Sequence, residues 1–299
     1  MMITIKDIAE MAQVSKGTVS RVINGAPGVG DETRKRILKM IKELDFQPNA
    51  SAQGLAAKHT NNIGLVIPDI GKNIMANNYW PVMLTEITLH AAVRDYNLLF
   101  STARSEKDRN SAYKSILKGR KIDGLIIDSY QFGEKQMAEL LLKDFPYVFI
   151  GRNSYITSNY VDIDGMNGSR LMTEHLIRLG HKEIAILSGS EQFINIHERI
   201  QGFKDAMIQA GLNPRYIFHC PYRIGDIIEE TKRILQQKPR PTALFAIAED
   251  LAIGVLKAIH EMGLKIPDDI AVVFFDDLPM YEFYWPSITA IRQPITEIA

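Results

Sequence analysis

Short apolar segments alternate with helical segments from residue 62 onward, and this alternation limits the fold more than any other feature of the chain. Ile63–Pro68 is an apolar run bounded by turn residues, which is typical of a strand buried on both faces of a parallel sheet. Similar strands are expected at 98–100, 124–127, 147–150, 184–187, 216–218, 243–246 and 270–274. Helices are expected between them at 83–96, 111–118, 134–143, 166–179, 198–210, 226–237 and 250–262. Strands that alternate with helices predict an open, doubly wound α/β sheet.

The alternation occurs twice, which predicts two similar lobes. The first series occupies about residues 61–162 and the second about 163–292. A length of 299 residues leaves room for more than one domain and for a large core. The fold class expected for this part is therefore a two-lobed, doubly wound α/β domain.

The segment from Thr4 to Asn24 has a different pattern, that of two short helices joined by a tight turn. Its apolar residues recur at helical spacing, stop around Gln13 and then resume. They are Ile5, Ile8, Ala9, Val19, Val22 and Ile23. Thr4 and Ser15 each precede a helical run and suit the N-cap position. Helices this short are marginal alone, so we expect them to pack on a third helix that begins at Asp31.

The second of these helices would present a polar face to solvent. The exposed residues are Lys16, Gly17, Thr18, Ser20, Arg21 and Asn24. Small, polar and cationic groups can enter a major groove and bond to base edges and phosphates, although an ordinary solvated helix face is the alternative. Residues 1–60 carry nine Lys and Arg against six Asp and Glu, whereas the whole chain is neutral. A basic head on an acidic body favours a polyanionic partner such as DNA.

These features, together with an ordered series of motifs, resemble the LacI/GalR family of bacterial repressors. The motifs are DETRKRI from residue 31, FQPNASAQGLA from 46, IGLVIP from 63, DGLII from 123, EHL from 174, RIQGF from 199, FDD from 275 and IRQP from 291. The resemblance therefore covers essentially the whole chain. In one departure, Gln13 stands where the family usually has Gly, which costs about 1 kcal/mol if the residue is left-handed.

The resemblance implies a helix-turn-helix domain over residues 1–48, in which the second helix reads the major groove. Thr4, Ser15 and Asn49 are further DNA contacts that it suggests. It also implies a hinge helix within residues 49–60 that orders when two subunits bind DNA together. Leu55 matches the leucine that wedges into a central base step of the minor groove, and a linker with an incidental leucine is the alternative.

Residues 61–299 would form the effector-binding and dimerisation domain, which is similar to periplasmic sugar-binding proteins with a ligand between the lobes. Polar residues in or near loops after strands are the candidates for this site. They are Asp69, Tyr79, Trp80, Asp164, Arg199, Tyr222, Glu249 and Asp276. Arg199 and Asp276 match family residues that grip ligand hydroxyls, and their donors and acceptors suit a polyol. An interlobe salt bridge is the alternative for this pair, and ordinary packing or a dimer contact is the alternative for Tyr79 and Trp80.

Two further departures concern the effector and the end of the chain. Ala248–Gly254 differs from the family's N-D-x-x-A-x-G pattern, so the effector cannot be copied from a relative. After the IRQP motif the family usually continues with a helix and a strand, whereas only Ile295–Ala299 remain. We expect either a fragment or truncated product, or a first lobe of 61–162 and 293–299 that lacks both elements.

Several classes of protein are excluded by the composition and by missing motifs. The single cysteine, Cys220, excludes an internal disulfide and a cysteine-cluster metal site. No apolar run is long enough to span a membrane, and the N-terminus does not resemble a signal peptide, so we expect a cytoplasmic protein. Phosphate-binding, nucleophile-elbow and HExxH motifs are missing, so we expect no enzyme, no cofactor and no metal site.

We therefore expect a homodimeric, sequence-specific transcriptional regulator that binds a pseudo-palindromic DNA operator. We expect it to be a repressor controlled by a sugar or sugar derivative. A pure small-molecule binding protein would need an export signal and no basic head, and an enzyme joined to a DNA-binding domain, such as a sugar kinase, would need a phosphate loop. An effector-blind regulator is the third alternative. The sequence does not specify whether the effector releases or promotes DNA binding.

Overall fold

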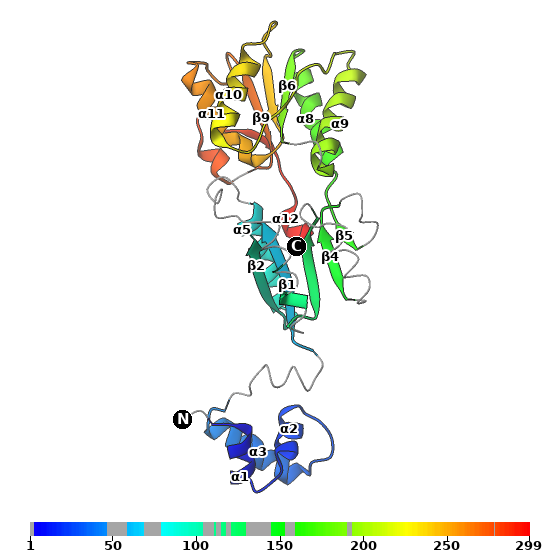
Figure 1. The fold of residues 1–299 in the computed structure, drawn as a ribbon, viewed down its shortest axis with the longest axis vertical. Helices are drawn as coiled ribbons and strands as arrows, with labels where there is room; N and C mark the ends of the chain where they lie inside the picture. The colour runs from blue at the N-terminus through cyan, green and yellow to red at the C-terminus, as the bar shows by residue number, and fades with distance from the viewer. Residues whose placement is uncertain are drawn as a thin grey trace. The chain divides into compact units, whose positions relative to one another are not determined.

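The computed structural model describes residues 3–46, 59–68, 79–103, 111, 115–117, 121–129, 145–152, 159–189, 193–277 and 279–299. The chain divides into two compact units, Met1–Asn61 and Asn62–Ala299. The first unit contains only helices among its described residues, and the second contains two parallel sheets with helices packed on them (Figure 1). No helix of the described ranges is both long and apolar enough to cross a membrane.

The first unit consists of three helices, α1 (Ile5–Met11), α2 (Lys16–Ile23) and α3 (Asp31–Glu43). Thr4 caps α1 in a capping box with Asp7, and Ser15 caps α2, so both predicted N-caps are confirmed. Gln13 has a φ of 51°, so the turn does use a left-handed residue other than glycine. Each helix contributes to one small core, formed by Ile8, Ala9, Ala12, Val19, Val22 and Ile37.

The first sheet of the second unit is entirely parallel, with the strand order β2-β1-β3-β4-β5. Its strands are β1 (Asn62–Pro68), β2 (Asn97–Ala103), β3 (Gly124–Asp128), β4 (Tyr147–Ile150) and β5 (Tyr160–Val161). Helix α5 (Tyr79–Ala92) packs on one face through Trp80, Met83 and Ile87. The short helix α12 (Ile295–Ile298) joins the same cluster, so the last described segment of the chain packs on the first lobe.

The second sheet is also parallel, with the order β10-β9-β8-β6-β7. Its strands are β6 (Ile184–Ser188), β7 (Ile217–His219), β8 (Ala243–Ala246), β9 (Ala271–Phe275) and β10 (Thr289–Ile291). The helical elements are α8 (Gly165–Arg178), α9 (Ile194–Gln209), α10 (Ile224–Leu235), η3 (Glu249–Leu251), α11 (Ala252–Glu261) and η4 (Pro279–Phe283). Helices α8 and α9 cover one face and α10 and α11 the other (Figure 1).

Successive residues of a strand enter opposite cores, as the period of two requires. In β9, Val273 and Phe275 pack with α8 and α9, whereas Val272 and Phe274 pack with α10 and α11. Both faces of the strand are therefore apolar, which explains its uninterrupted apolar run. The predicted fold class, a helix-turn-helix unit followed by doubly wound α/β lobes, is confirmed.

The structure corrects several predicted element boundaries. Helix α5 begins at Tyr79 rather than at residue 83, and α9 begins at Ile194 rather than at 198. The short elements β5, β10, η4 and α12 were not predicted, because two to five residues carry no periodic signal. The helix expected at 134–143 lies outside the described residues, as does most of the helix expected at 111–118.

Gly202 in the RIQGF motif sets how closely α8 and α9 pack. A Cβ atom at this position would lie 2.0 Å from the backbone oxygen of Met166. No side chain can relieve that overlap, since the obstacle is backbone. The motif therefore needs glycine for the approach of the two helices.

Candidate functional sites

Helix α2 presents a face with uncompensated positive charge. Lys16 and Arg21 are exposed, and within the described residues neither side chain has a hydrogen bond or an ion pair. Thr18 and Ser20 are half-buried beside them, whereas Gly17 and Asn24 are exposed. Val19 and Val22, on the opposite side, are buried and hold the helix on the core. The arrangement leaves the cations available to an external polyanion.

Some of the predicted DNA-contacting side chains already have partners within the protein. The backbone N–H of Thr18 donates to Oγ of Ser15 at 3.1 Å, and the two hydroxyls share a hydrogen bond of 2.9 Å. Both the hydroxyl and the backbone N–H of Thr4 donate to Asp7, and these bonds lower the pKa of that carboxyl. Nδ2 of Asn24 donates to Ser20 at 3.4 Å. Thr4 and Ser15 thus have structural roles, and their contact with DNA stays a prediction.

Gly17 is not required by the packing of the protein. The nearest atom to a Cβ built there is Oγ of Ser15 at 3.6 Å, an ordinary van der Waals distance. Glycine in a helix lowers stability by roughly 0.5–1 kcal/mol relative to alanine. Its effect is to keep this exposed turn of α2 free of side-chain bulk between Lys16 and Thr18.

Two arginines on α3 are engaged inside the first unit. Nη2 of Arg34 donates to the carbonyl of Ala26 at 2.6 Å, and Nη2 of Arg36 donates to the carbonyl of Ala12 at 2.9 Å. These bonds tie α3 to the loop after α2 and to the end of α1. Arg34 belongs to the DETRKRI motif on α3, and its side chain holds α3 against the loop after α2. Asn49 and Leu55, the hinge candidates, lie outside the described residues.

A cavity of about 600 Å³ lies where elements of both lobes meet. The first lobe contributes α5, and the second contributes η3, the loop after β9 and η4. Three of the predicted effector residues, Tyr79, Glu249 and Asp276, lie together in its wall. The remaining lining residues are Val82, Asp277, Pro279, Glu282, Arg292, Gln293, Pro294, Ile295, Thr296 and Glu297.

Hydrogen bonds connect this wall across the two lobes. The backbone N–H of Tyr79 lies 3.5 Å from Oε1 of Glu249, which is 5% exposed. Nε2 of Gln293 donates to Oδ1 of Asp276, whose backbone has a φ of 78°. Burial raises the pKa of the Tyr79 hydroxyl, and the carboxylates of Asp128 and Asp276 raise it further. The Tyr79 hydroxyl therefore remains protonated and able to donate.

Arg199 lies inside the second lobe rather than in the cavity wall. Its Nη1 donates to the carbonyl of Ile247 at 2.7 Å, and its guanidinium lies 3.6 Å from the ring centre of Phe275. The same nitrogen is 3.8 Å from Oδ2 of Asp276. Arg199 on α9 and Asp276 after β9 belong to the same lobe, so the alternative of an interlobe salt bridge was wrong. Arg199 also lies within α9 and not at its start.

Other predicted effector residues have different surroundings. Trp80 is 6% exposed and packs in the core of the first lobe, so the packing alternative holds for it. Asp164 caps α8 by accepting from the N–H of Asn167 at 2.9 Å. Tyr222 packs over Gly189, and burial raises the pKa of its hydroxyl to about 12. None of the three lines the cavity. Asp69 lies outside the described residues.

The structure adds an interlobe contact that the sequence did not predict. Arg152, which follows β4 in the first lobe, donates to Asp162 at 3.0 Å and to Glu198 on α9 at 2.5 Å. No local sequence pattern predicts that Arg152 contacts Glu198, because this contact depends on how the two lobes meet. The guanidinium therefore joins the two lobes through a pair of carboxylates.

Asp250 is a second residue that sequence reasoning passed over. Its Oδ1 is buried and has no hydrogen-bond partner among the described residues. Burial, and to a smaller extent the charge of Asp276, raise the pKa of this carboxyl to about 6. The folded protein therefore holds the proton of Asp250 more tightly than water does.

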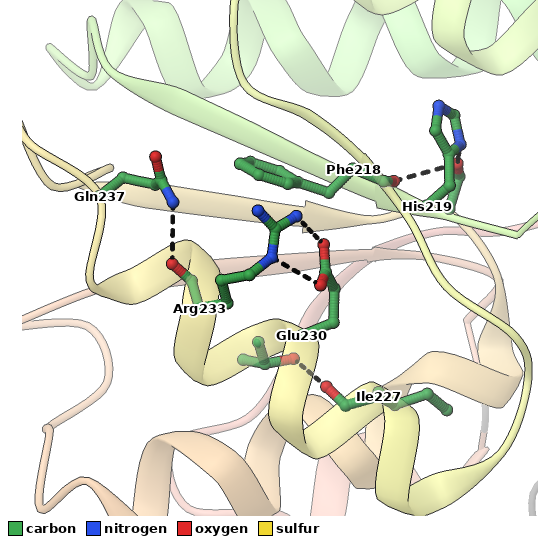
Figure 2. A network of polar contacts seen from close by, with 8 residues as sticks. Phe218, His219, Ile227, Glu230, Arg233 and Gln237 are labelled. Carbon is green, nitrogen blue, oxygen red and sulfur yellow. Dashed lines mark hydrogen bonds and ion pairs between the residues drawn. The ribbon is translucent and has the colours of Figure 1, made fainter.

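A second cavity, of about 570 Å³, lies beside α10 and the end of β7. Here the guanidinium of Arg233 forms two hydrogen bonds with Glu230, of 2.8 and 2.5 Å, and lies over the ring of Phe218 (Figure 2). Lys232, also in this wall, is paired with Glu229 and Glu261. These two cations are already engaged by carboxylates.

Comparison with known proteins identifies the family. The sequence profile described as "Bacterial regulatory proteins, lacI family" matches residues 4–49. Catabolite control protein A of Priestia megaterium is 34% identical over 304 residues, which covers 100% of this chain and 90% of that protein. The chain belongs to the lacI family. It is therefore a DNA-binding transcriptional regulator, and the lacI-family relatives are named as regulators rather than as enzymes.

Solved structures of the lacI family share the fold. The lac repressor dimer bound to operator and the anti-inducer ONPF gives a TM-score of 0.84 at 27% identity, covering 100% of this chain and 89% of that one. The complex of the transcriptional regulator CelR with cellobiose gives 0.71 at 27% identity, covering 99% and 89%. The profile of a periplasmic binding protein-like domain matches residues 173–299.

Proposed function

We propose that this lacI-family member is a repressor that binds a pseudo-palindromic operator as a homodimer and responds to a small carbohydrate-type effector. The observation that carries the DNA half of the proposal is the exposed cationic face of α2, where Lys16 and Arg21 have no ion pair among the described residues. Lys16, Ser20 and Arg21 would read one half-site in the major groove. Because such a protein acts on chromosomal DNA, we place it in the cytoplasm.

The predicted hinge, within residues 49–60, would contribute to the same interface. Under the proposal, Asn49 contacts DNA and two Leu55 side chains, one from each subunit, open the central base step of the operator. The support for this step is the FQPNASAQGLA motif from residue 46. Bending the duplex would then depend on bringing two hinges together.

The effector half of the proposal rests on the interlobe cavity. Its volume of about 600 Å³ suits a small ligand. Its wall contains Tyr79 from the first lobe and Glu249 and Asp276 from the second. A ligand that touches both lobes binds their closed and open arrangements with different affinities, which is what a population shift requires. The CelR–cellobiose complex supports a carbohydrate as the class of ligand.

The DNA half is tested by isolating the sequences that the purified chain binds from a pool of genomic fragments. We expect enrichment of a site with two inverted half-sites, bound by two subunits. The Arg21→Ala variant is the matched comparison, because it removes one exposed cation and no described intramolecular bond. Enrichment of no common sequence, or of single half-sites by a monomer, would contradict the proposal.

A further inference from the structure

The guanidinium of Arg152 is anchored in the first lobe and reaches the second lobe with its other end. Its Nε donates to Oδ2 of Asp162 at 3.0 Å, and the two residues follow β4 and β5 of the first lobe. Its Nη2 donates to Oε1 of Glu198 on α9 at 2.5 Å. Because a planar guanidinium holds two acceptors in a fixed geometry, the first bond orients the second. The bond to Glu198 therefore crosses to the second lobe from a fixed position.

The carboxylates on both sides of this guanidinium are largely removed from water. The side chains of Asp162 and Glu198 are 14% and 19% exposed, and that of Arg152 is 37% exposed. Asp162 is also held by its second oxygen, since Oδ1 accepts from the N–H of Ile163 at 2.9 Å. Solvent and salt screen such a pair less than they screen a fully exposed one. Separation of the lobes at this point would leave the Glu198 carboxylate without its described partner.

The ion pair between Arg152 and Glu198 is distinct from the cavity wall but close enough to be affected by it. Neither residue lines the cavity. Burial raises the pKa of the Tyr79 hydroxyl in the wall, and the carboxylate of Asp162 is among the charges that raise it further. The N–H of Tyr79 also faces Oε1 of Glu249 across the lobes, at 3.5 Å, which is longer than a typical hydrogen bond. A ligand could therefore occupy the cavity while the ion pair stays intact.

We propose that the ion pair between Arg152 and Glu198 is a latch that holds the two lobes closed over the cavity and sets how readily they separate. This inference rests on the proposed function, in which an effector shifts the lobes between closed and open arrangements. The latch needs no contact with the effector, because opening the lobes breaks the ion pair wherever the effector lies. An effector that prefers the closed arrangement adds to the latch, and one that prefers the open arrangement acts against it.

The test measures the separation of the lobes in the full-length protein without ligand, by pulsed electron paramagnetic resonance between two spin labels. Lys121→Cys in the first lobe and Lys182→Cys in the second place the labels at exposed positions outside the cavity wall. Cys220→Ser removes the native thiol. An excess of unlabelled chain leaves most dimers with one labelled subunit, so that distances between subunits do not contribute.

Glu198→Gln keeps the shape of one partner and removes its charge. We expect it to reduce the population with the wild-type separation at least about threefold, in favour of a longer separation. Arg152→Met should give at least this change, and adding Glu198→Gln to it should change nothing further, because both substitutions break the same pair. A further change in the double variant would show that the two side chains act separately and would overturn the latch.

Glu174→Gln is the matched control. Its ion pair with Arg170 lies within α8 of a single lobe, so the separation should be unchanged. If Glu198→Gln or Arg152→Met does not fold, the wild-type protein still decides. Rising KCl screens the pair, so the longer separation should become more populated. A separation that salt does not alter would overturn the latch.

The affinity for a selected operator separates the latch from the proposed function. Fluorescence anisotropy compares Glu198→Gln with Glu174→Gln, and we expect only the first to change the dissociation constant, by at least about threefold. If the separation lengthens while the dissociation constant stays the same, the latch is right and the proposed coupling of the lobes to DNA fails. If Glu198→Gln leaves the separation unchanged, the latch is wrong and the proposed function stands.

Discussion

The α2 face and the interlobe cavity use arginine in opposite ways. On α2, Arg21 is exposed and has no ion pair among the described residues. Arg152 and Arg292 at the junction of the lobes, and Arg199 inside the second lobe, are all bound to acceptors within the protein. The difference shows that the number of arginines near a site predicts little about its ligand. What matters is which charges remain without an internal partner.

The largest effect on stability is expected at Gly202 in the second unit, and Gly17 in the first unit serves as its comparison. Gly202→Ala places Cβ against the backbone of α8, so the free energy of unfolding of the second unit should fall by more than about 3 kcal/mol. Gly17→Ala meets no close atom and should raise the stability of the first unit by about 0.5 kcal/mol. Both tryptophans, Trp80 and Trp285, lie in the second unit, so tryptophan fluorescence in urea follows the unfolding of that unit. Circular dichroism of the helices also reports the unfolding of the first unit. A neutral Gly202→Ala would contradict the tight packing of α8 on α9.

The next effect tests whether Arg199 acts inside the protein. Arg199→Met leaves the carbonyl of Ile247 without its donor and Asp276 without its nearby cation, so the second unit should lose about 3 kcal/mol of stability. Tryptophan fluorescence in urea measures this loss. Arg215→Met, which breaks an exposed pair with Glu183, is the control and should cost less than about 0.5 kcal/mol. An equal loss of stability in the two variants would contradict the structural role of the buried Arg199.

The third effect concerns the unengaged arginine. Arg21→Ala should weaken specific operator binding by about 2 kcal/mol and leave folding unchanged, because the side chain has no described partner in the protein. Fluorescence anisotropy with a selected operator measures the loss. Lys39→Ala, also exposed in the first unit but 3.7 Å from Glu43, should change binding by less than about 0.5 kcal/mol. Unaltered binding by Arg21→Ala would remove Arg21 from the DNA interface.

The smallest effect is a dependence of stability on pH. Folding raises the pKa of Asp250 from an ordinary value of 3.8 to about 6, so the folded state holds this proton more tightly. Stability should therefore fall as pH rises from about 4 to about 6, by on the order of 1 kcal/mol after allowance for partial exposure. Asp250→Asn should reduce this fall and be the more stable protein at pH 7. Urea unfolding at several pH values measures both, and equal pH profiles would contradict the burial of this charge.

The two regions also differ in how far the sequence predicts them. Thr4, Ser15 and the turn at Gln13 could be predicted because caps and turns depend on residues within three or four positions. The apolar runs of the strands likewise predicted the doubly wound fold. Trp80 could not be distinguished from its neighbour Tyr79, since the helix period alone does not say which side chain meets the core. The pairing of Tyr79 with Glu249 depends on segments 170 residues apart.

The cavity wall shows a second limit of local patterns. Asp276 was a candidate because it follows a strand, but Arg292 and Gln293 were known only as part of a motif. Their bonds to Asp277 and Asp276 arise because the chain passes from β10 toward α12 beside the loop after β9. The elements along this part of the chain are η4, β10 and α12, and none of them has enough residues to show a period in the sequence.

The most direct test of the contrast between the two regions is to follow the arginine Nε–H signals by nuclear magnetic resonance while operator DNA is added. We expect the Arg21 signal to shift, because its guanidinium is unengaged and would meet the duplex. The signals of Arg199 and Arg292 should stay close to their positions, because those groups are held by Ile247 and Asp277. An unmoved Arg21 signal, with shifts at Arg199 or Arg292 instead, would contradict the account.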